Sequence, residues 1–458
     1  MEAITYARAH RDRCLAELQD FLRIPSVSTQ AKHQEDVEEA AGWLRDRLLE
    51  AGFPEARVMP TDGHPVVFAE WSDAGDAAPT LLIYGHYDVQ PPDPLDLWKT
   101  PPFEPTLKGD DLYARGASDD KGQLYTHVKA VEAWRETRGA PPVNVKCIFE
   151  GEEESGSPSL DAFIREHKDL LSADAALVSD TGFIGKDVPS IVYGLRGLAY
   201  LEIEVTGPDH DLHSGTYGGA VLNPINALCR LVADLQDENG RILIPGFYDR
   251  VVELRDEERA ELAEIPFDRG TWLEETGVPT DWGEAEYSIL ERVSARPTLD
   301  LNGIWGGYTE PGAKTVLPSK AFAKLSMRLV PDQDPQRIAE LAADHIRALA
   351  PPAVQVEVRP LHGGEPALVD RESPMIEAAS RAYEEGFGLK PVLVRRGGSI
   401  PVVAKMQSIL GIETILMGFG LPDDRLHSPN EKFHIPNFYR GIETSIHFMD
   451  FLGGEPVS

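Results

Sequence analysis

A short apolar stretch that ends in a histidine and an aspartate constrains the fold of this chain most strongly. Residues 79–90 read PTLLIYGHYDVQ, in which an apolar run stops at Gly85 and is followed by His86 and Asp88. Such a run, bounded by glycine and proline, is typical of a buried strand that delivers polar groups at its carboxyl end. Open α/β sheets place their sites in the crevice beyond the strand ends, so this stretch predicts a site there.

The two polar residues of this stretch are candidates for a metal site. His86 could bind a metal ion through one ring nitrogen while Asp88 fixes the orientation of the ring. Taken alone, a His-x-Asp pair after a strand is more often ordinary loop chemistry. The other acidic clusters of the chain therefore decide between the two interpretations.

The size and composition of the chain indicate a soluble protein of two domains. Its 458 residues exceed a single core, which stops growing at about 250–300 residues. No apolar run approaches the roughly 18 residues that a membrane span needs, so no membrane partner is expected. The amino-terminal stretch lacks the uninterrupted apolar core of a signal peptide, and we expect a cytoplasmic location.

The net charge of −32 argues against a nucleic-acid partner, because binding phosphates requires a basic surface. Part of the acidic excess could serve a cation site. Most of it need not, since acidic side chains on solvated faces promote solubility.

Two adjacent carboxylates, Asp119 and Asp120, precede a helical stretch at residues 124–136, LYTHVKAVEAWRE. Adjacent acids at the start of a helix are usually caps, which the helix dipole favours. By themselves these two residues are more simply interpreted as caps than as ligands.

An acidic cluster follows the next predicted strand. Residues 143–149, VNVKCIF, alternate as a strand does and lead into EGEEESG, which holds four carboxylates in five residues. Such a cluster at a strand end is costly unless a cation or solvent compensates it. A solvated acidic loop is the simple alternative, but the apolar strand directs this cluster inward.

Two more apolar runs, 173–178 and 414–419, lead to an aspartate and to a loop with a histidine. Candidate ligands thus follow five predicted strands or loops: His86, Asp119, Glu153 with Glu154, Asp180 and His427. Two imidazoles with several carboxylates suit zinc, manganese or cobalt. One carboxylate shared between two ions would give a two-metal arrangement, in which a bridging water becomes a nucleophile near neutral pH.

Eight motifs, in order along the chain, resemble those of the M20 family of metallopeptidases: GHYDVQP, ARGASDDKGQ, EGEEESGS, VSDT, DLHSGTYGG, RLVPDQ, GGSIP and DDRLHSPNEK. The similarity spans nearly the whole chain and is greatest to the dipeptidase branch, which includes cytosolic non-specific dipeptidase and carnosinase. The resemblance implies an α/β fold with a mixed-sheet, zinc-peptidase-like catalytic domain. It also implies an inserted α+β lid domain that carries a homodimer contact.

The resemblance assigns roles to the candidate residues. It implies two divalent ions per chain, zinc or manganese with cobalt possible, held by His86 and Asp180, by Glu154 and His427, and by Asp119 as the bridge. Glu153 matches the general base, and Asp88 matches the carboxylate that orients His86. In the family the peptide bond that matches Asp119-Asp120 is typically cis.

The expected domain boundaries place the catalytic domain at residues 1–196 and 365–458, with the lid at 197–364. The inserted segment begins with the alternating AYLEIEVTG and contains two strand runs around two helical stretches, which suggests a small α+β domain. The charged stretch 237–296 has no regular periodicity, and we assign it no structure.

Two residues of the inserted segment gain a role only from the resemblance. His213 by itself would be a surface or turn histidine, but its match comes from the partner subunit and polarises the scissile carbonyl. Arg328 would be an outward strand residue, but its match binds the carboxylate of the substrate, which suits the bidentate fork of arginine. Further substrate-contacting positions are Thr315, His362, Gly398 and Ser399. Asn302 stands where animal carnosinase-type enzymes have a histidine, which disfavours a preference for carnosine.

The sequence thus predicts a dinuclear metal-dependent dipeptidase that acts on short peptides. One alternative is an N-acyl amino acid or succinyl-amide hydrolase of the same superfamily, which the order of the motifs does not exclude. A second is a metal-binding protein that binds peptides without turnover. The base Glu153 beside Glu154 argues against the second alternative.

Overall fold

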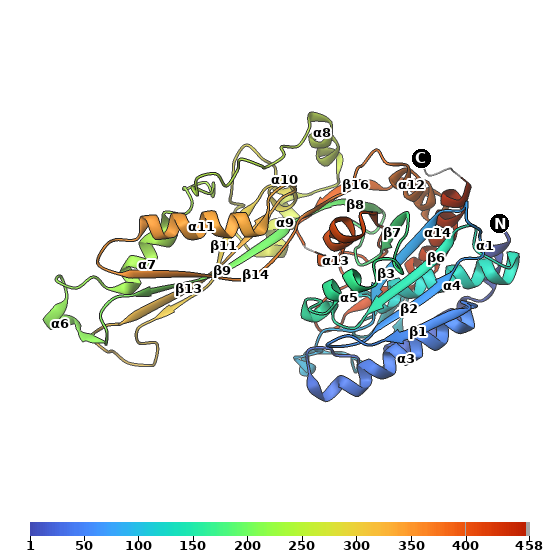
Figure 1. Cartoon of the computed structure of the whole chain (residues 1–458), viewed down its shortest axis with the longest axis horizontal. Coiled ribbons are helices and arrows are strands. Elements are labelled where there is room, and N and C mark those ends of the chain that lie inside the picture. The colour runs from blue at the N-terminus through green and yellow to red at the C-terminus, as the bar shows by residue number, and fades with distance from the viewer. Residues whose placement is uncertain (399, 455–458) are drawn as a thin grey trace. The chain divides into compact units, whose positions relative to one another are not determined.

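The computed structural model describes residues 1–398 and 400–454, and the chain forms two compact units (Figure 1). The first unit comprises Met1–Tyr193, Val369–Val394 and the described residues from Pro401 onward. The second comprises Gly194–Leu368 and the described residues of 395–400.

The largest sheet is mixed and has nine strands, in the order β1-β2-β6-β3-β7-β17-β8-β15, with β16 also pairing with β8 (Figure 1). In that order the strands are Glu55–Met59, Val66–Trp71, Asn144–Glu150, Thr80–His86, Ala175–Val178, Glu413–Leu416, Ser190–Leu195 and Ala367–Leu368, with β16 at Val392–Arg396. The central strands β6, β3, β7 and β17 run parallel to one another. Their carboxyl ends therefore lie at one edge of the sheet, where open α/β sheets bind their ligands.

The central strands and the helices of the first unit bury an extensive apolar core. Strand β3 is buried from Leu81 to His86, as expected for a parallel strand that is covered on both faces. The longer helices are α1 (Glu2–Ala9), α2 (Arg11–Leu22), α3 (Gln34–Ala51), α4 (Lys121–Arg138), α12 (Pro374–Phe387) and α14 (Ile435–Gly454). Helices α1 and α2 are separated only by His10, which is the C-cap residue of α1 and the N-cap residue of α2.

Helix α4 is central to this unit. It contacts β3 as well as the helices α1, α3 and α14. Every residue from Lys121 to Trp134 is buried, so the helix has no long solvent-facing stripe. It ends at Gly139, whose φ of 83° is the left-handed conformation that favours glycine after a helix.

Shorter elements complete the first unit. They are β4 (Thr106–Lys108), β5 (Asp111–Tyr113), β18 (Lys432–His434), α5 (Leu160–Glu166) and α13 (Pro401–Lys405). Strands β18, β5 and β4 form a small antiparallel sheet, which joins the segment near Asp119 to the segment near His427.

The second unit is built on a four-stranded antiparallel sheet in the order β11-β13-β9-β14. These strands are Thr298–Gly306, Lys320–Leu329, Gly197–Thr206 and Gln355–Gly364. Strand β13 alternates between buried and partly exposed residues along most of its length, as a sheet with one covered face requires. Helices α7 (Pro224–Ala233) and α11 (Pro335–Leu349) pack against this sheet.

The stretch 237–296, to which the sequence assigned no structure, contains three short helices. They are α8 (Asp256–Glu264), α9 (Arg269–Thr276) and α10 (Ile289–Ser294). The unit also contains β10 (Leu212–His213), β12 (Val316–Leu317) and α6 (Ser214–Tyr217). Helices α8 and α9 show almost no segregation of apolar side chains to one face, which explains why periodicity did not reveal them.

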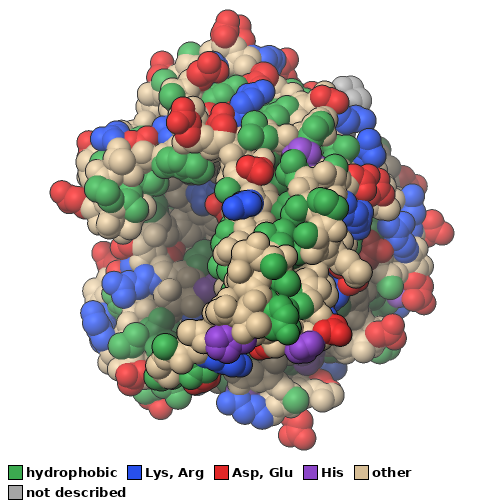
Figure 2. Space-filling view, turned by 90° about the vertical axis from the view of Figure 1, so that its left-hand side faces the viewer, with side chains coloured by type: hydrophobic (Ala, Val, Ile, Leu, Met, Phe, Trp, Pro, Cys, Tyr) green, Lys and Arg blue, Asp and Glu red, His purple; other side chains and the backbone are tan. Residues whose placement is uncertain are grey.

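Acidic residues outnumber Lys and Arg by 76 to 44 over the whole sequence. On the face that Figure 2 shows, acidic and basic side chains are interspersed rather than gathered by sign. Within the described part of the chain, no helix is both long enough and apolar enough to cross a membrane.

One buried carboxyl in this fold leads to a prediction about stability. Strand β6 ends at Glu150, which accepts hydrogen bonds from the hydroxyl groups of Tyr84 and Ser157. Burial raises the pKa of Glu150 to about 8. The folded protein therefore binds a proton at Glu150 more tightly than the unfolded chain, in which the pKa is about 4.3. The resulting contribution to stability is fully present below about pH 4.3 and is lost as the pH rises through 8.

We expect Glu150→Gln to weaken the pH dependence of stability in the metal-free protein. Glutamine stays neutral at every pH, so the stability of the variant relative to wild type should rise by a few kcal/mol between about pH 5 and pH 9. Urea unfolding with a chelator present measures this difference. Glu166→Gln, which changes an exposed carboxyl, is the control. An unchanged pH dependence in Glu150→Gln would contradict the prediction.

Candidate dinuclear metal centre

Three parallel strands deliver four of the candidate site residues of the first unit. His86 is the last residue of β3, and Asp180 lies two residues beyond the end of β7. Glu153 and Glu154 lie in a short 3-10 turn that follows β6. Because these strands are parallel neighbours, the sheet brings together side chains that lie far apart in the sequence.

The carboxylate of Asp119 lies between two imidazoles. Its Oδ1 is 3.0 Å from His86 Nε2, and its Oδ2 is 3.0 Å from His427 Nε2. His427 Nε2 is also 3.2 Å from Glu154 Oε2. Asp119 and His86 are buried, whereas His427 is exposed.

Asp88 contacts both the last residue of β3 and the turn that follows β6. Nδ1 of His86 lies 3.1 Å from the carbonyl oxygen of Asp88 and 3.4 Å from its Oδ1. The Asp88 carboxylate accepts hydrogen bonds from the backbone amides of Glu153 (3.2 Å) and Glu154 (3.1 Å). Asp88 is therefore placed to orient the His86 ring and the acidic turn together.

Two groups of side chains could each hold a metal ion. One is His86, Asp119 and Asp180, and the other is Asp119, Glu154 and His427. Within each group the ligand atoms lie within 4.8 Å of one another. Imidazole nitrogens with carboxylate oxygens are a donor set that suits divalent zinc or manganese. The residues present therefore fit divalent cations, with Asp119 common to both groups.

The pKa values of the site reflect crowded negative charge. Burial raises the pKa of Asp180 well above its usual value, and the charge of Asp119 adds to this effect. Burial, with the charges of Glu154, Asp119 and Asp88, raises the pKa of Glu153 to about 7 against the opposing influence of His86. A divalent cation would offset this repulsion, because an opposite charge favours the ionised carboxylate.

The pKa values of the two histidines are also raised, which favours their charged form. Hydrogen bonds to Asp119 and Glu154 raise the pKa of His427 to about 10. Burial disfavours a charged His86, but its contacts with Asp119 and Asp88 outweigh burial and raise its pKa. Burial raises the pKa of Asp119, but its hydrogen bonds with the two imidazoles outweigh burial and lower it.

The simple interpretation of Asp119 and Asp120 as helix caps is wrong. Asp120 occupies the N-cap position of α4, but its side chain makes no capping hydrogen bond. Asp119 faces the imidazoles of His86 and His427 instead. The Asp119-Asp120 peptide bond is cis, as the resemblance implies.

Sequence reasoning missed three residues that support the site. Ser28 Oγ donates a hydrogen bond to Asp88 Oδ2 at 2.6 Å, and Gln90 Nε2 donates to Glu154 Oε2 at 2.8 Å. The third is Glu431, whose carboxylate accepts hydrogen bonds from Arg115 and from three backbone amides. Gln90 and Glu431 lie inside the motifs GHYDVQP and DDRLHSPNEK, so these motifs were the available signal.

Glu431 fixes the loop that carries Asp119. Its fully buried carboxylate accepts hydrogen bonds from the amides of Gly116 (3.0 Å), Ser118 (3.0 Å) and Asp119 (3.2 Å). Arg115 donates to the same carboxylate at 2.6 Å. The loop before α4 is thus anchored by a residue from the end of the chain.

The remaining predicted site residues belong to the second unit. His213 and Thr315 lie close together, because β10 pairs with β12 and Ser214 N donates to the carbonyl oxygen of Thr315 at 3.1 Å. The His213 side chain is exposed, and its Nδ1 accepts a hydrogen bond from the amide of Gly215. Gly398 is exposed, and Ser399 lies outside the described residues.

Arg328 lines a pocket of about 330 Å³ in the second unit, together with Arg196. Burial and the charge of Arg328 lower the pKa of Arg196 to about 10. The lining also contains Arg292, Arg296, Glu284 and Asp300, so the pocket carries charges of both signs with four arginines against two carboxylates.

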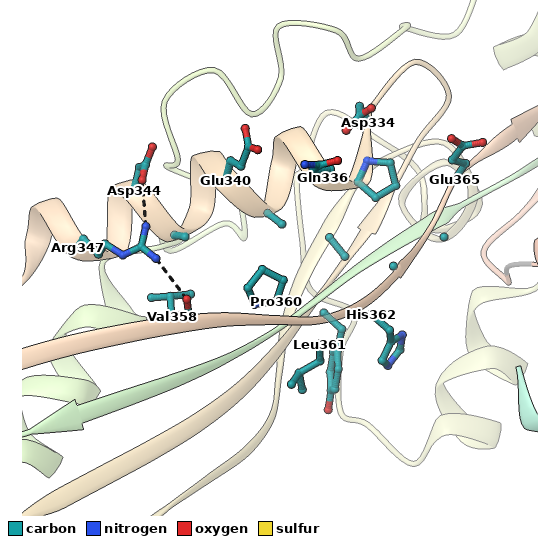
Figure 3. Close-up of a pocket in the computed structure, with 17 residues that line it drawn as sticks. Asp334, Gln336, Glu340, Asp344, Arg347, Val358, Pro360, Leu361, His362 and Glu365 are labelled. Carbon is teal, nitrogen blue, oxygen red and sulfur yellow. Dashed lines mark hydrogen bonds and ion pairs between the residues drawn. The ribbon is translucent and has the colours of Figure 1, made fainter. Parts of the chain in front are cut away.

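His362 lies on β14 opposite Tyr200 of β9, and the two rings are 5.0 Å apart. A groove of about 610 Å³ lies between α11 and β14, with Glu340 and Asp344 on its helix side. Figure 3 shows His362 and Leu361 on the side of the strand that faces away from α11.

Comparison with known proteins identifies the family. The model for peptidase family M20/M25/M40 matches residues 82–450. The chain is 33% identical to Cys-Gly metallodipeptidase DUG1 of Candida albicans, over 97% of this chain and 95% of the relative. It is 32% identical to human Beta-Ala-His dipeptidase, over 96% of this chain and 90% of the relative.

A solved structure supports the same assignment. The M20 family metallo-carboxypeptidase Sso-CP2 of Sulfolobus solfataricus superimposes with a TM-score of 0.86 at 34% identity, covering 96% of this chain and 99% of that one. The predicted M20 resemblance and the predicted α/β class with a mixed sheet are confirmed. We conclude that the chain is an enzyme of peptidase family M20/M25/M40.

Proposed function

We propose that this enzyme is a dinuclear metal-dependent dipeptidase that hydrolyses the peptide bond of short peptides. The observation that carries the proposal is the position of Asp119, which belongs to both candidate ligand groups. Relatives that align over nearly the whole chain are named as dipeptidases of Cys-Gly and of Beta-Ala-His, which supports a dipeptide substrate.

Two divalent ions per chain would complete the centre, as zinc or manganese, with cobalt also suited. One would be held by His86 and Asp180, the other by Glu154 and His427, and both by Asp119. When bound, the ions would polarise the scissile carbonyl and lower the pKa of water.

Glu153 is the proposed general base. It is adjacent to the ligand Glu154 but belongs to neither candidate ligand group, so its carboxylate remains available for proton transfer. A carboxylate in this position can accept a proton from water and then donate it to the leaving amine, and burial, which raises its pKa, favours the donation. Asp88 contributes by orienting His86 and by holding the backbone of Glu153.

The second unit would serve as the lid and carry the contact of a homodimer, with boundaries near residues 197 and 364. His213 would act across the dimer and stabilise the developing oxyanion in the partner's site. Arg328 would bind the carboxylate of the peptide, which is supported by its place in a pocket together with Arg196. Thr315, His362, Gly398 and Ser399 would make further substrate contacts.

A turnover screen with metal-reloaded protein tests the proposed substrate class. We expect dipeptides, Cys-Gly among them, to be hydrolysed faster than tripeptides, N-acetyl amino acids or N-succinyl amino acids. Faster turnover of the acyl or succinyl compounds would contradict the dipeptidase proposal and favour the related amide hydrolases. No turnover of any compound by protein with both ions bound would favour a binding protein.

We expect the metal-free protein to take up close to two equivalents of Zn²⁺ or Mn²⁺ per chain, because two ligand groups are present. Metal analysis after gentle reloading and removal of excess ion measures this number. A plateau at one equivalent in fully active protein would contradict the bridging role of Asp119.

We expect Glu153→Gln and Glu154→Gln to fail in different ways. The first removes a proton acceptor but no ligand, so it should retain both ions and lose roughly 10²–10⁴-fold in kcat. The second removes a ligand and should weaken the binding of one ion. Metal analysis and kcat measured on both variants separate these effects, and equal loss of metal from both would contradict the assignment.

We expect subunit mixing to restore activity if His213 acts across the dimer. Glu153→Gln and His213→Ala should each be nearly inactive, but a mixed dimer of the two has one intact site. Random re-association gives about half mixed dimers, so activity should recover to about a quarter of wild type. The absence of recovery, with subunit exchange shown by native mass spectrometry, would place His213 outside the partner's site.

A further inference from the structure

A buried histidine that the proposed mechanism does not use lies near the metal centre. His127 is on α4, is fully buried, and contacts a serine with each ring nitrogen. Its Nε2 is 2.7 Å from Ser179 Oγ, and its Nδ1 is 2.9 Å from Ser445 Oγ. Ser179 immediately precedes the candidate ligand Asp180, and Ser445 lies on α14.

The neighbouring hydrogen bonds fix the direction of this network. The hydroxyl of Ser179 donates to the carbonyl oxygen of Met417 at 2.6 Å, so its oxygen must accept from His127. Nε2 of His127 therefore carries the hydrogen, and Nδ1 of the neutral ring is an acceptor. The hydroxyl of Ser445 lies 2.9 Å from Nδ1 and 2.8 Å from the carbonyl oxygen of Gly441, one turn earlier on α14. Because that carbonyl already accepts the helical hydrogen bond from the Ser445 amide, the hydroxyl can donate to Nδ1 instead. Burial lowers the pKa of His127 to about 3, which agrees with the neutral ring that this direction requires.

The network connects α4 to the ends of two strands. Ser179 follows the last residue of β7, and Met417 follows the last residue of β17. The amide of Met417 also donates to the carbonyl oxygen of Val178 at 2.9 Å. The backbone just before Asp180 is thus held both by the neighbouring strand and, through Ser179, by His127.

One turn earlier on α4, the side chain of Gln123 also connects the helix to segments that carry the site. Gln123 Nε2 donates to the carbonyl oxygen of Ser118 at 2.9 Å, directly before Asp119. Gln123 Oε1 accepts from the amide of Phe419 at 2.6 Å. Residues four apart on a helix share a face, so Gln123 and His127 connect the loop of Asp119 and the strand end of Asp180 to one rigid helix.

We propose that His127 is a positioning residue for the ion site of His86, Asp119 and Asp180. By donating a hydrogen bond to Ser179, it fixes the backbone from which Asp180 extends, relative to the helix that begins beside Asp119. This inference rests on the proposed dinuclear site. Groups that orient a metal ligand typically change metal affinity by about 10–100-fold when they are removed.

Two substitutions at the same position separate positioning from packing. In His127→Gln the amide nitrogen can occupy the place of Nε2 and retain the donor to Ser179. In His127→Asn the amide oxygen can occupy the place of Nδ1, which retains the contact with Ser445 and loses the donor to Ser179. Asparagine is one methylene shorter than glutamine and loses more packing, so two serine substitutions that leave the ring in place complete the comparison.

Calorimetric titration of the metal-free proteins with Zn²⁺ measures the affinity of each equivalent. We expect His127→Asn to weaken one of two equivalents by about 10–100-fold, and His127→Gln to bind both nearly as wild type does. Equal affinities in the two variants would overturn the inference. Wild type that binds only one equivalent would instead contradict the proposed dinuclear site.

Two serine substitutions test the positioning role of His127 if a His127 variant does not fold. Ser179→Ala removes the group through which His127 acts, whereas Ser445→Ala removes the contact on the other side of the ring. We expect Ser179→Ala to weaken one equivalent by about 10–100-fold and Ser445→Ala to leave both affinities unchanged. Equal effects of the two serine substitutions would overturn the inference.

Discussion

The interaction on which the site depends is the contact of one carboxylate with two imidazoles. Asp119 lies 3.0 Å from both His86 and His427, and these two residues come from opposite ends of the sequence. Acidic side chains around this centre would repel one another if nothing compensated their charge. Hydrogen bonds from backbone amides and the nearby imidazoles offset part of this repulsion. Divalent cations, which the two ligand groups fit, would offset more of it.

Much of the sheet of the first unit could be predicted, because short apolar runs in the sequence mark its strands. The apolar runs before His86, Glu153 and Asp180 correspond to the strands β3, β6 and β7. Since parallel strands share an edge, the sequence also indicated that these polar residues meet. The family resemblance supplied the roles that local patterns do not contain, such as that of Arg328 on an otherwise ordinary strand.

The details that sequence reasoning missed depend on contacts between distant segments. Local spacing alone favoured a cap at Asp119, and the other candidate clusters and the family resemblance made it a candidate ligand, because His427, which faces it, lies in another part of the chain. The same holds for Ser28, whose hydroxyl reaches Asp88 from the loop after α2. Helices α8 and α9 escaped prediction for a different reason, since their charged sequences lack an apolar stripe.

The anchoring of the Asp119 loop by Glu431 has a consequence for how the enzyme is made. The amide of Asp119 and the carboxylate that binds it are 312 residues apart, and the whole Gly194–Leu368 segment lies between them. A ribosome releases the amino-terminal strands first, so their acidic ends emerge before His427 and Glu431 exist. The nascent chain therefore holds only part of the candidate ligand set until His427 and Glu431 have been synthesised.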